Sequence, residues 1–138
     1  MSGFAITLPY AIYRIPVQDP WERKPSILLV SLAKNAQLRM GDRNQALVRE
    51  AKRQMRQDAG ALMLAASWPE MRLPLVMDAE ITTRTAVRKD DDGAVVGLYP
   101  VRDQIASSLG VNDSEIRIGK IEFRKGASES STITITGA

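Results

Sequence analysis

The most regular pattern in the sequence lies in residues 75–93, which read LVMDAEITTRTAVRKDDDG. Apolar or threonine side chains stand at every second position from Leu75 to Val87, and polar side chains such as Asp78 and Glu80 stand between them. A period of two is typical of a strand with one buried face. We therefore expect a strand here that runs directly into the acidic residues at 90–92.

Two further elements are expected before this strand. Residues 4–8 form a short apolar run ended by Pro9, which predicts a first strand. Residues 10–24 are then expected as a loop, whose Trp21 to Lys24 cluster is either a contact surface or a Trp anchor among solvated charges. Residues 25–38 fit either a helix or a buried apolar segment. From Asp42, an N-cap candidate, apolar residues at a spacing of four predict a helix: Leu47, Ala51, Met55 and Ala59, followed by Leu62.

A second helix and two strands are expected after the acidic residues. Pro100 suits the first turn of a helix with Val101, Ile105 and Leu109 as its apolar stripe and Gly110 as its end; whether residues 94–98 add an earlier turn stays open. Strands are expected at 116–123, with a bulge near Gly119, and at 132–136, joined by a hairpin loop at 126–131. The order β-α-β-α-β-β predicts one domain over residues 1–138 of the α/β (α+β) class, a small mixed β-sheet with two or three packed helices.

The composition excludes several kinds of chemistry. The chain has no Cys and no His, so disulfides, zinc fingers and Ser-His or Cys-His catalysis are excluded. Any metal must be bound by oxygen, which favours Mg²⁺ or Mn²⁺ and also permits Ca²⁺. The sequence shows neither a signal peptide nor a stretch of about 18 apolar residues, so we expect a cytoplasmic protein without a membrane partner.

The charges are distributed unevenly along the chain. Residues 1–72 hold 11 Lys and Arg against 6 Asp and Glu, whereas residues 73–138 hold 8 against 10. On the first helix, cations at spacings of three and four predict a strip that could follow a phosphate backbone, or alternatively an ordinary solvated face: Arg49, Lys52, Arg53 and Arg56.

The acidic residues of the second half are candidates for a metal site. Asp90 and Asp92 follow one strand and Asp113 precedes another, so the three would meet if these strands lay side by side. Crowded carboxylates need a compensating cation, and Mg²⁺ would then activate water for phosphodiester cleavage. The alternative is that Asp90 to Asp92 form a turn and an N-cap, and that Asp113 and Ser114 form a turn before a strand.

The segment from Arg88 to Ile135 resembles the core of RusA-like Holliday-junction resolvases. In that family a strand ends in Arg-Asp-X-Asp-Asn, a helix carries Lys and then Asp-X-Leu, and an Asn-Asp-Ser or Asp-Asp turn opens a final hairpin. Here the corresponding segments are KDDDG at 89–93, DQI at 103–105 and LGVNDS at 109–114. The first 87 residues match more loosely.

The resemblance implies a dimeric, Mg²⁺- or Mn²⁺-dependent endonuclease, often phage-borne, that cuts branched DNA in recombination and repair within a bacterial or phage-infected cell. It implies metal and catalytic roles for Asp90, Asp92 and Asp113, with Asp103 in support. Further DNA contacts are expected from Arg88, Lys89 and Arg102, beside those of the basic helix.

Two positions depart from the family pattern. Gly93 replaces the family's Asn, and Val96 or Tyr99 stands where the family carries its Lys. Arg102, Lys89 or Lys120 would have to replace that cation. Two other classes of function therefore stay open: a DNA-binding or interaction module that kept the fold without the chemistry, and a structural protein unrelated to nucleic acid.

Overall fold

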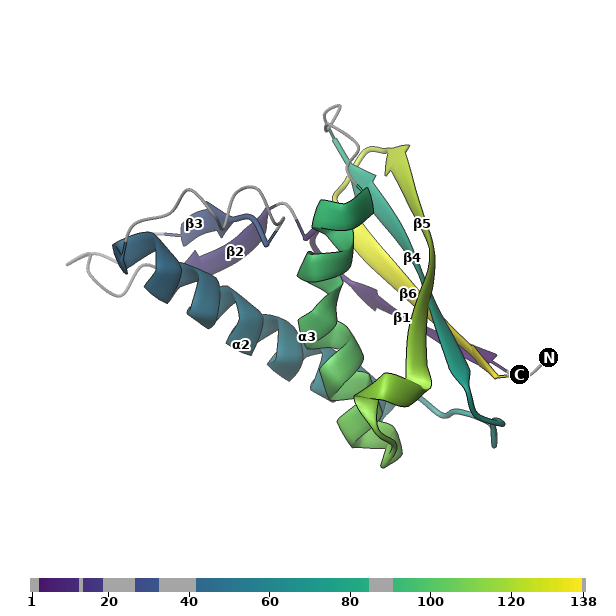
Figure 1. Ribbon diagram of the computed structural model, residues 1–138. Coiled ribbons are helices and arrows are strands. Elements are labelled where there is room, and N and C mark those ends of the chain that lie inside the picture. The colour runs from purple at the N-terminus through teal and green to yellow at the C-terminus, as the bar shows by residue number, and fades with distance from the viewer. Residues whose placement is uncertain (1–2, 13, 19–26, 33–41, 85–90, 138) are drawn as a thin grey trace.

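The computed structural model describes residues 3–12, 14–18, 27–32, 42–84 and 91–137. They form an α+β fold, as expected, with two helices and a mixed four-stranded sheet (Figure 1). The elements in chain order are β1 (Gly3–Leu8), β2 (Ile15–Gln18), β3 (Ile27–Val30), α2 (Asp42–Ala65), β4 (Leu75–Thr83), α3 (Asp91–Leu109), the 3₁₀ turn η1 (Asp113–Glu115), β5 (Ile116–Lys125) and β6 (Ser130–Gly137).

The expected order lacked two strands. Residues 15–18 lie in the segment expected to be a loop, and residues 27–30 lie in the segment left open, yet they pair antiparallel as β2 and β3. Four residues are too few for a period to show. Ile15 and Val17 are buried, and the hairpin contacts α2, so tertiary packing selects these strands.

The strand order in the main sheet is β1-β6-β4-β5. β4 pairs antiparallel with β6 and parallel with β5. The expected hairpin between β5 and β6 is therefore wrong, because β4 lies between them. The connection crosses the end of β4, where the Gly126 N–H donates to the Thr83 carbonyl at 2.9 Å.

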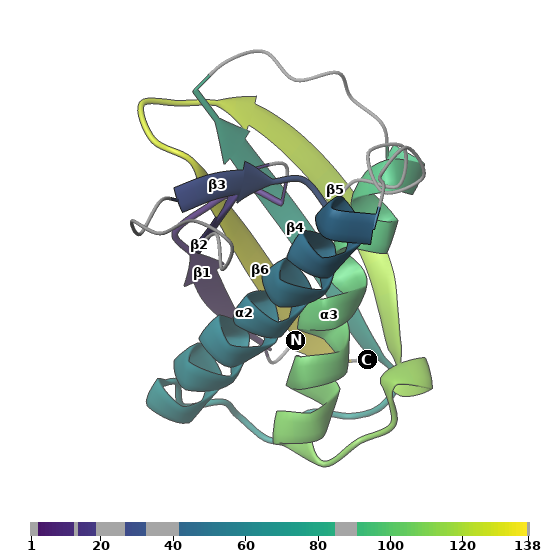
Figure 2. The same ribbon diagram turned by 90° about the vertical axis from the view of Figure 1, so that its left-hand side faces the viewer.

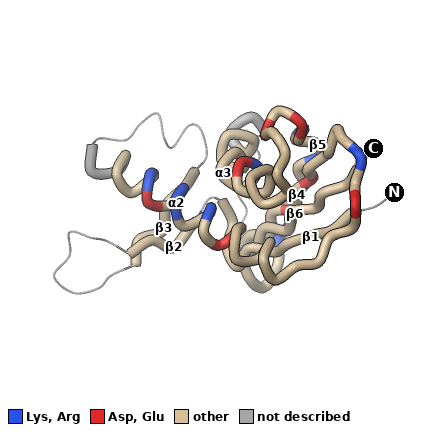
Figure 3. Tube along the Cα trace, turned by 90° about the horizontal axis from the view of Figure 1, so that it is seen from below, with Lys and Arg blue, Asp and Glu red and all other residues tan. Residues whose placement is uncertain are grey.

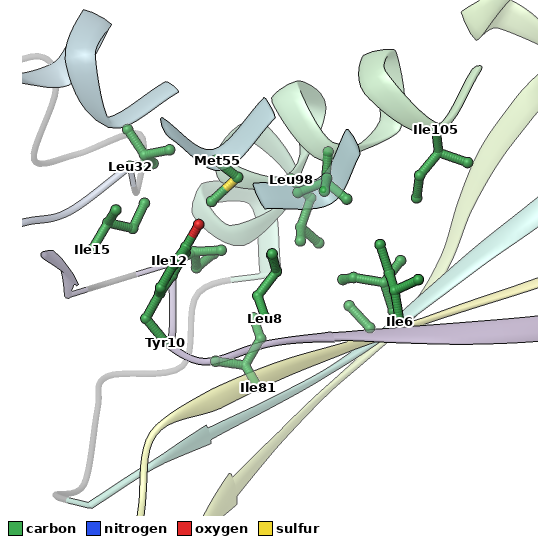
Figure 4. Packing of buried hydrophobic residues seen from close by; sticks show 14 of the residues in the cluster. Ile6, Leu8, Tyr10, Ile12, Ile15, Leu32, Met55, Ile81, Leu98 and Ile105 are labelled. Carbon is green, nitrogen blue, oxygen red and sulfur yellow. The ribbon is translucent and has the colours of Figure 1, made fainter. Parts of the chain in front are cut away.

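Both helices lie on one face of this sheet, and α3 contacts both α2 and β5 (Figures 1 and 2). Along β4, every second residue from Leu75 to Thr83 is buried, which confirms the alternation over that range; residues 85–90 lie outside the described residues. Met55 of α2 and Leu98 of α3 point toward Leu8 and Ile81 of the sheet (Figure 4). The residues at a spacing of four on α2 are buried as expected: Leu47, Ala51, Met55 and Ala59.

The second helix begins earlier than expected. α3 starts at Asp91, and Pro100 lies in its interior rather than in its first turn. A proline there removes a backbone hydrogen bond. Ala94 and Leu98 are buried in one stripe with Val101 and Ile105, so packing of the longer helix outweighs that loss.

The end of α3 and the bulge in β5 are both confirmed. Gly110 has φ +72°, and the Val111 N–H donates to the Ala106 carbonyl at 3.0 Å, as in a Schellman C-cap. The pairing of β4 with β5 shifts register so that Asp78 faces both Gly119 and Lys120. The Lys120 N–H donates to Asp78 Oδ1 at 2.7 Å, which satisfies the donor that the bulge frees from the ladder.

No helix in the described part of the chain is long and apolar enough to cross a membrane.

Candidate functional site

Two of the three predicted metal ligands, Asp92 and Asp113, lie beyond opposite ends of most of α3 within one chain. β4 and β5 lie side by side as expected, but they are parallel, and Leu75 at the start of β4 pairs with Ile116 at the start of β5. Asp113 therefore lies near the start of β4. Asp92 lies in the first turn of α3, and the rest of this helix, about 25 Å long, separates it from the turn that holds Asp113.

Within one chain, α3 therefore holds Asp92 apart from Asp113. Asp90 lies outside the described residues. Among the residues that the structure describes, no group of three Asp, Glu, His or Cys side chains is placed to hold a metal ion. The physical reason is that α3 returns the chain to the opposite end of the sheet before β5 begins.

Asp113 lies in a well-defined turn. The Asn112 side chain accepts a hydrogen bond from the Ser114 N–H at 3.0 Å, and Glu115 accepts one from the Asn112 N–H in a capping box. The Asp113 side chain is 50% exposed, and its carboxylate lies 3.8 Å from the Arg102 guanidinium. The carboxylate is thus accessible to a ligand, although the turn itself needs no ligand to form.

Arg102 lies within a small charged cluster on α3. Its Nε is 3.7 Å from Asp103 Oδ1, its Nη2 faces Asp113, and its guanidinium lies over the Tyr99 ring at 4.6 Å. The Arg102 side chain is only 23% exposed. The structure therefore brings together the predicted supporting acid Asp103, the predicted ligand Asp113 and the predicted DNA contact Arg102. In this arrangement Arg102 already faces two carboxylates.

The cationic strip lies along α2, where several Lys and Arg positions lie close together on the Cα trace (Figure 3). Arg49, Arg53 and Arg56 are exposed and Lys52 is half-buried. Arg53 hydrogen-bonds to Glu50, and this guanidinium lowers the pKa of Glu50. Within the described residues, the other three cations have no acidic partner.

A shallow hollow of about 250 Å³ lies on this strip, lined by Gln45, Val48, Arg49 and Lys52. Two unpaired cations at one concave place favour an anion such as a phosphate group. The strip from Arg49 to Arg56 extends about 10 Å along the helix, or about three steps of B-form DNA.

Four other contacts were expected, and the structure describes one of them, Lys120. Arg88, Lys89 and the Trp21 to Lys24 cluster lie outside the described residues. Lys120 belongs to β5, on the far side of α3 from α2, and the hydrogen bond that its backbone makes to Asp78 serves the bulge.

Sequence reasoning missed the polar contacts that fix α2 against the segment from Tyr10 to Pro16. The Tyr10 hydroxyl donates to Asp58 Oδ2 at 2.6 Å, and the Gln54 amide donates to the Pro16 carbonyl at 2.8 Å. Burial, and then the hydrogen bond to Asp58, raise the pKa of Tyr10. Nothing local in the sequence marks these pairs, because their members lie 48 and 38 positions apart.

No protein-family model matches this sequence, and no curated protein matches it.

Proposed function

We propose that this protein binds the phosphate backbone of branched DNA through α2 and cleaves it as a metal-dependent endonuclease in a symmetric pair of chains. The observation that carries the proposal is the exposed cationic strip: Arg49, Lys52 and Arg56 lack acidic partners among the described residues and lie on one face of a helix. Cations that a fold leaves unpaired on one face are available to replace the counterions of a polyanion.

DNA binding by the strip is tested with a triple variant, Arg49→Gln, Lys52→Gln and Arg56→Gln. Three lost phosphate contacts should lower the slope of log affinity against log salt by about 2.7. Arg53→Gln is the matched control and should change the slope less, because Arg53 is already paired with Glu50. Fluorescence anisotropy with a labelled four-way junction measures both. An unaltered slope in the triple variant would assign the strip to an ordinary solvated face.

Cleavage requires a second chain, because Asp92 and Asp113 lie at opposite ends of α3. In a two-fold symmetric pair with the two α3 helices antiparallel, the start of one α3 approaches the end of the other, and two equivalent sites result. Each site would combine Asp92 of one chain with Asp113 of its partner. These donors are carboxylate oxygens, which suit Mg²⁺ or Mn²⁺; such an ion, when bound, lowers the pKa of water and stabilises charge on a phosphate.

A mixing experiment distinguishes a shared site from one within a single chain. Asp92→Asn and Asp113→Asn should each abolish cleavage of a four-way junction in Mn²⁺. When the two variants are unfolded and refolded together, about half of the pairs contain one chain of each kind, and one of the two sites in such a pair has both native carboxylates. Nicking at up to about a quarter of the native level is expected.

The outcomes of the mixing experiment separate three readings. If the mixture stays inactive although native protein treated in the same way recovers activity, the shared site is refuted. A native protein that binds the junction but does not cut it in Mg²⁺ or Mn²⁺ would instead be a DNA-binding module. The capping box around Asp113 favours this second candidate, because it explains the turn without a metal. Indifference to both a junction and a linear duplex would exclude both functions.

A further inference from the structure

The Arg102 cluster consists of Arg102, Tyr99, Asp103 and Asp113, and it lies outside the cationic strip of α2. Arg102 faces Asp103 through Nε at 3.7 Å and Asp113 through Nη2 at 3.8 Å. Both distances exceed the 2.7–3.2 Å of an N–H···O hydrogen bond. The two carboxylates therefore compensate the charge of the guanidinium without forming hydrogen bonds to it.

Two atoms of the cluster are left without hydrogen-bond partners. Arg102 Nε and Asp103 Oδ1 are both shielded from solvent, and neither makes a hydrogen bond. A guanidinium prefers an acceptor that takes two parallel N–H bonds, as a phosphate or a carboxylate can. Arg102 thus has unused donor capacity, and Tyr99 holds its planar group by stacking over it at 4.6 Å.

We propose that Asp113 holds Arg102 in reserve as a phosphate-binding cation, and that Arg102 becomes available to DNA when the Asp113 carboxylate is neutralised. The inference rests on the proposed DNA-binding function. The half-exposed Asp113 carboxylate competes with a phosphate for Nη2 of Arg102, while Asp103 and Tyr99 keep the guanidinium in place. A divalent cation bound at Asp113 would remove the competitor, so that metal binding and phosphate binding at this end of α3 support each other.

The proposal is tested without any metal, in EDTA, by measuring the affinity for a labelled DNA duplex between 50 and 200 mM salt. Asp113→Asn should bind with one additional phosphate contact. One contact adds about 0.9 to the salt slope, so the loss of affinity across this range should be about 3.5-fold greater than for the native protein. Arg102→Gln alone should match the native slope, because the native Arg102 is held by its carboxylates.

Two controls separate release of Arg102 from the simple loss of a negative charge. Glu115→Gln removes a carboxylate from the same turn, two residues from Asp113, and should leave the salt slope unchanged. The double variant Asp113→Asn, Arg102→Gln should return to the native slope. Circular dichroism of every variant checks that each one is folded.

Each remaining outcome has one meaning. If the native protein binds DNA and Asp113→Asn has the same slope, Arg102 is not held in reserve, and the proposed DNA binding by α2 stands. If the gain of Asp113→Asn persists in the double variant, Arg102 is not its source and the inference is overturned. If none of the proteins binds DNA, the proposed function fails and the inference fails with it.

Discussion

Replacing Tyr10 by Phe should loosen the attachment of α2, the helix that carries the cationic strip. The Tyr10 side chain is 4% exposed, and its hydroxyl donates to the half-buried Asp58 carboxylate at 2.6 Å. A hydrogen bond to a charged acceptor contributes about 1.5–3 kcal/mol. Because water can reach part of Asp58, we expect the lower end, a loss of about 1.5 kcal/mol from the free energy of unfolding at pH 8.

The same contact makes the stability depend on alkaline pH. Burial and the bond to Asp58 raise the pKa of Tyr10 above its ordinary value of 10.0. Above pH 10 the unfolded chain therefore releases the phenol proton while the folded protein keeps it, and the unfolded state is favoured. The contribution of Tyr10 is complete below pH 10 and falls by about 1.4 kcal/mol for each pH unit above it. By pH 11 the loss reaches about 1.4 kcal/mol.

Urea unfolding followed by far-UV circular dichroism measures both effects. The native protein should exceed Tyr10→Phe by about 1.5 kcal/mol at pH 8, and this difference should nearly vanish at pH 11. Asp58→Asn should keep most of the alkaline decline, because burial is the larger cause of the raised pKa. A difference between native protein and Tyr10→Phe that stays constant from pH 8 to pH 11 would refute this reasoning.

Three further predictions follow from the same structure. Gly119→Ala should lower the free energy of unfolding, measured in urea, by about 2–3 kcal/mol, because the new Cβ would lie 2.8 Å from Val76 Cγ1 and closer still to Asp78 Oδ1. An unchanged urea midpoint would contradict the bulge. Gly110→Ala should lower the free energy of unfolding by about 1 kcal/mol, because φ at this position is +72° while the surroundings leave room for a Cβ. An unchanged free energy of unfolding would contradict the left-handed cap. Light scattering in Mn²⁺ should report twice the mass of one chain, and a monomer at micromolar concentration would contradict the shared site.

The sequence predicted the elements whose signals are local. The alternation from Leu75 to Thr83 reports one buried face of β4, and the spacing of four on α2 reports the face that meets the sheet. Gly110 ends α3 because only glycine adopts a positive φ at little cost. The sequence predicts the bulge at Gly119 because the apolar residues before it, Ile116 and Ile118, have even numbers and those after it, Ile121 and Phe123, have odd numbers.

Sequence could not predict contacts between distant segments. The hairpin of β2 and β3 rests on two four-residue strands that become stable only against α2. β6 follows β5 in the chain but pairs with β1 and β4, since strand order depends on which apolar faces pack together. Pro100 predicts a helix that starts near residue 100, but burial of the apolar stripe from Ala94 to Ile105 stabilises a helix that begins at Asp91.

The candidate site shows the same division. From the sequence alone it follows that only oxygen donors are available, that carboxylates lie at 90–92 and 113, and that the first helix carries cations on one face. The positions of these carboxylates and cations relative to one another depend on the tertiary structure. Because β4 and β5 are parallel, the connecting helix α3 must run back along the sheet, and it places Asp92 and Asp113 at its two ends. Arg102, eleven positions before Asp113 in the chain, lies beside Asp113 in the fold.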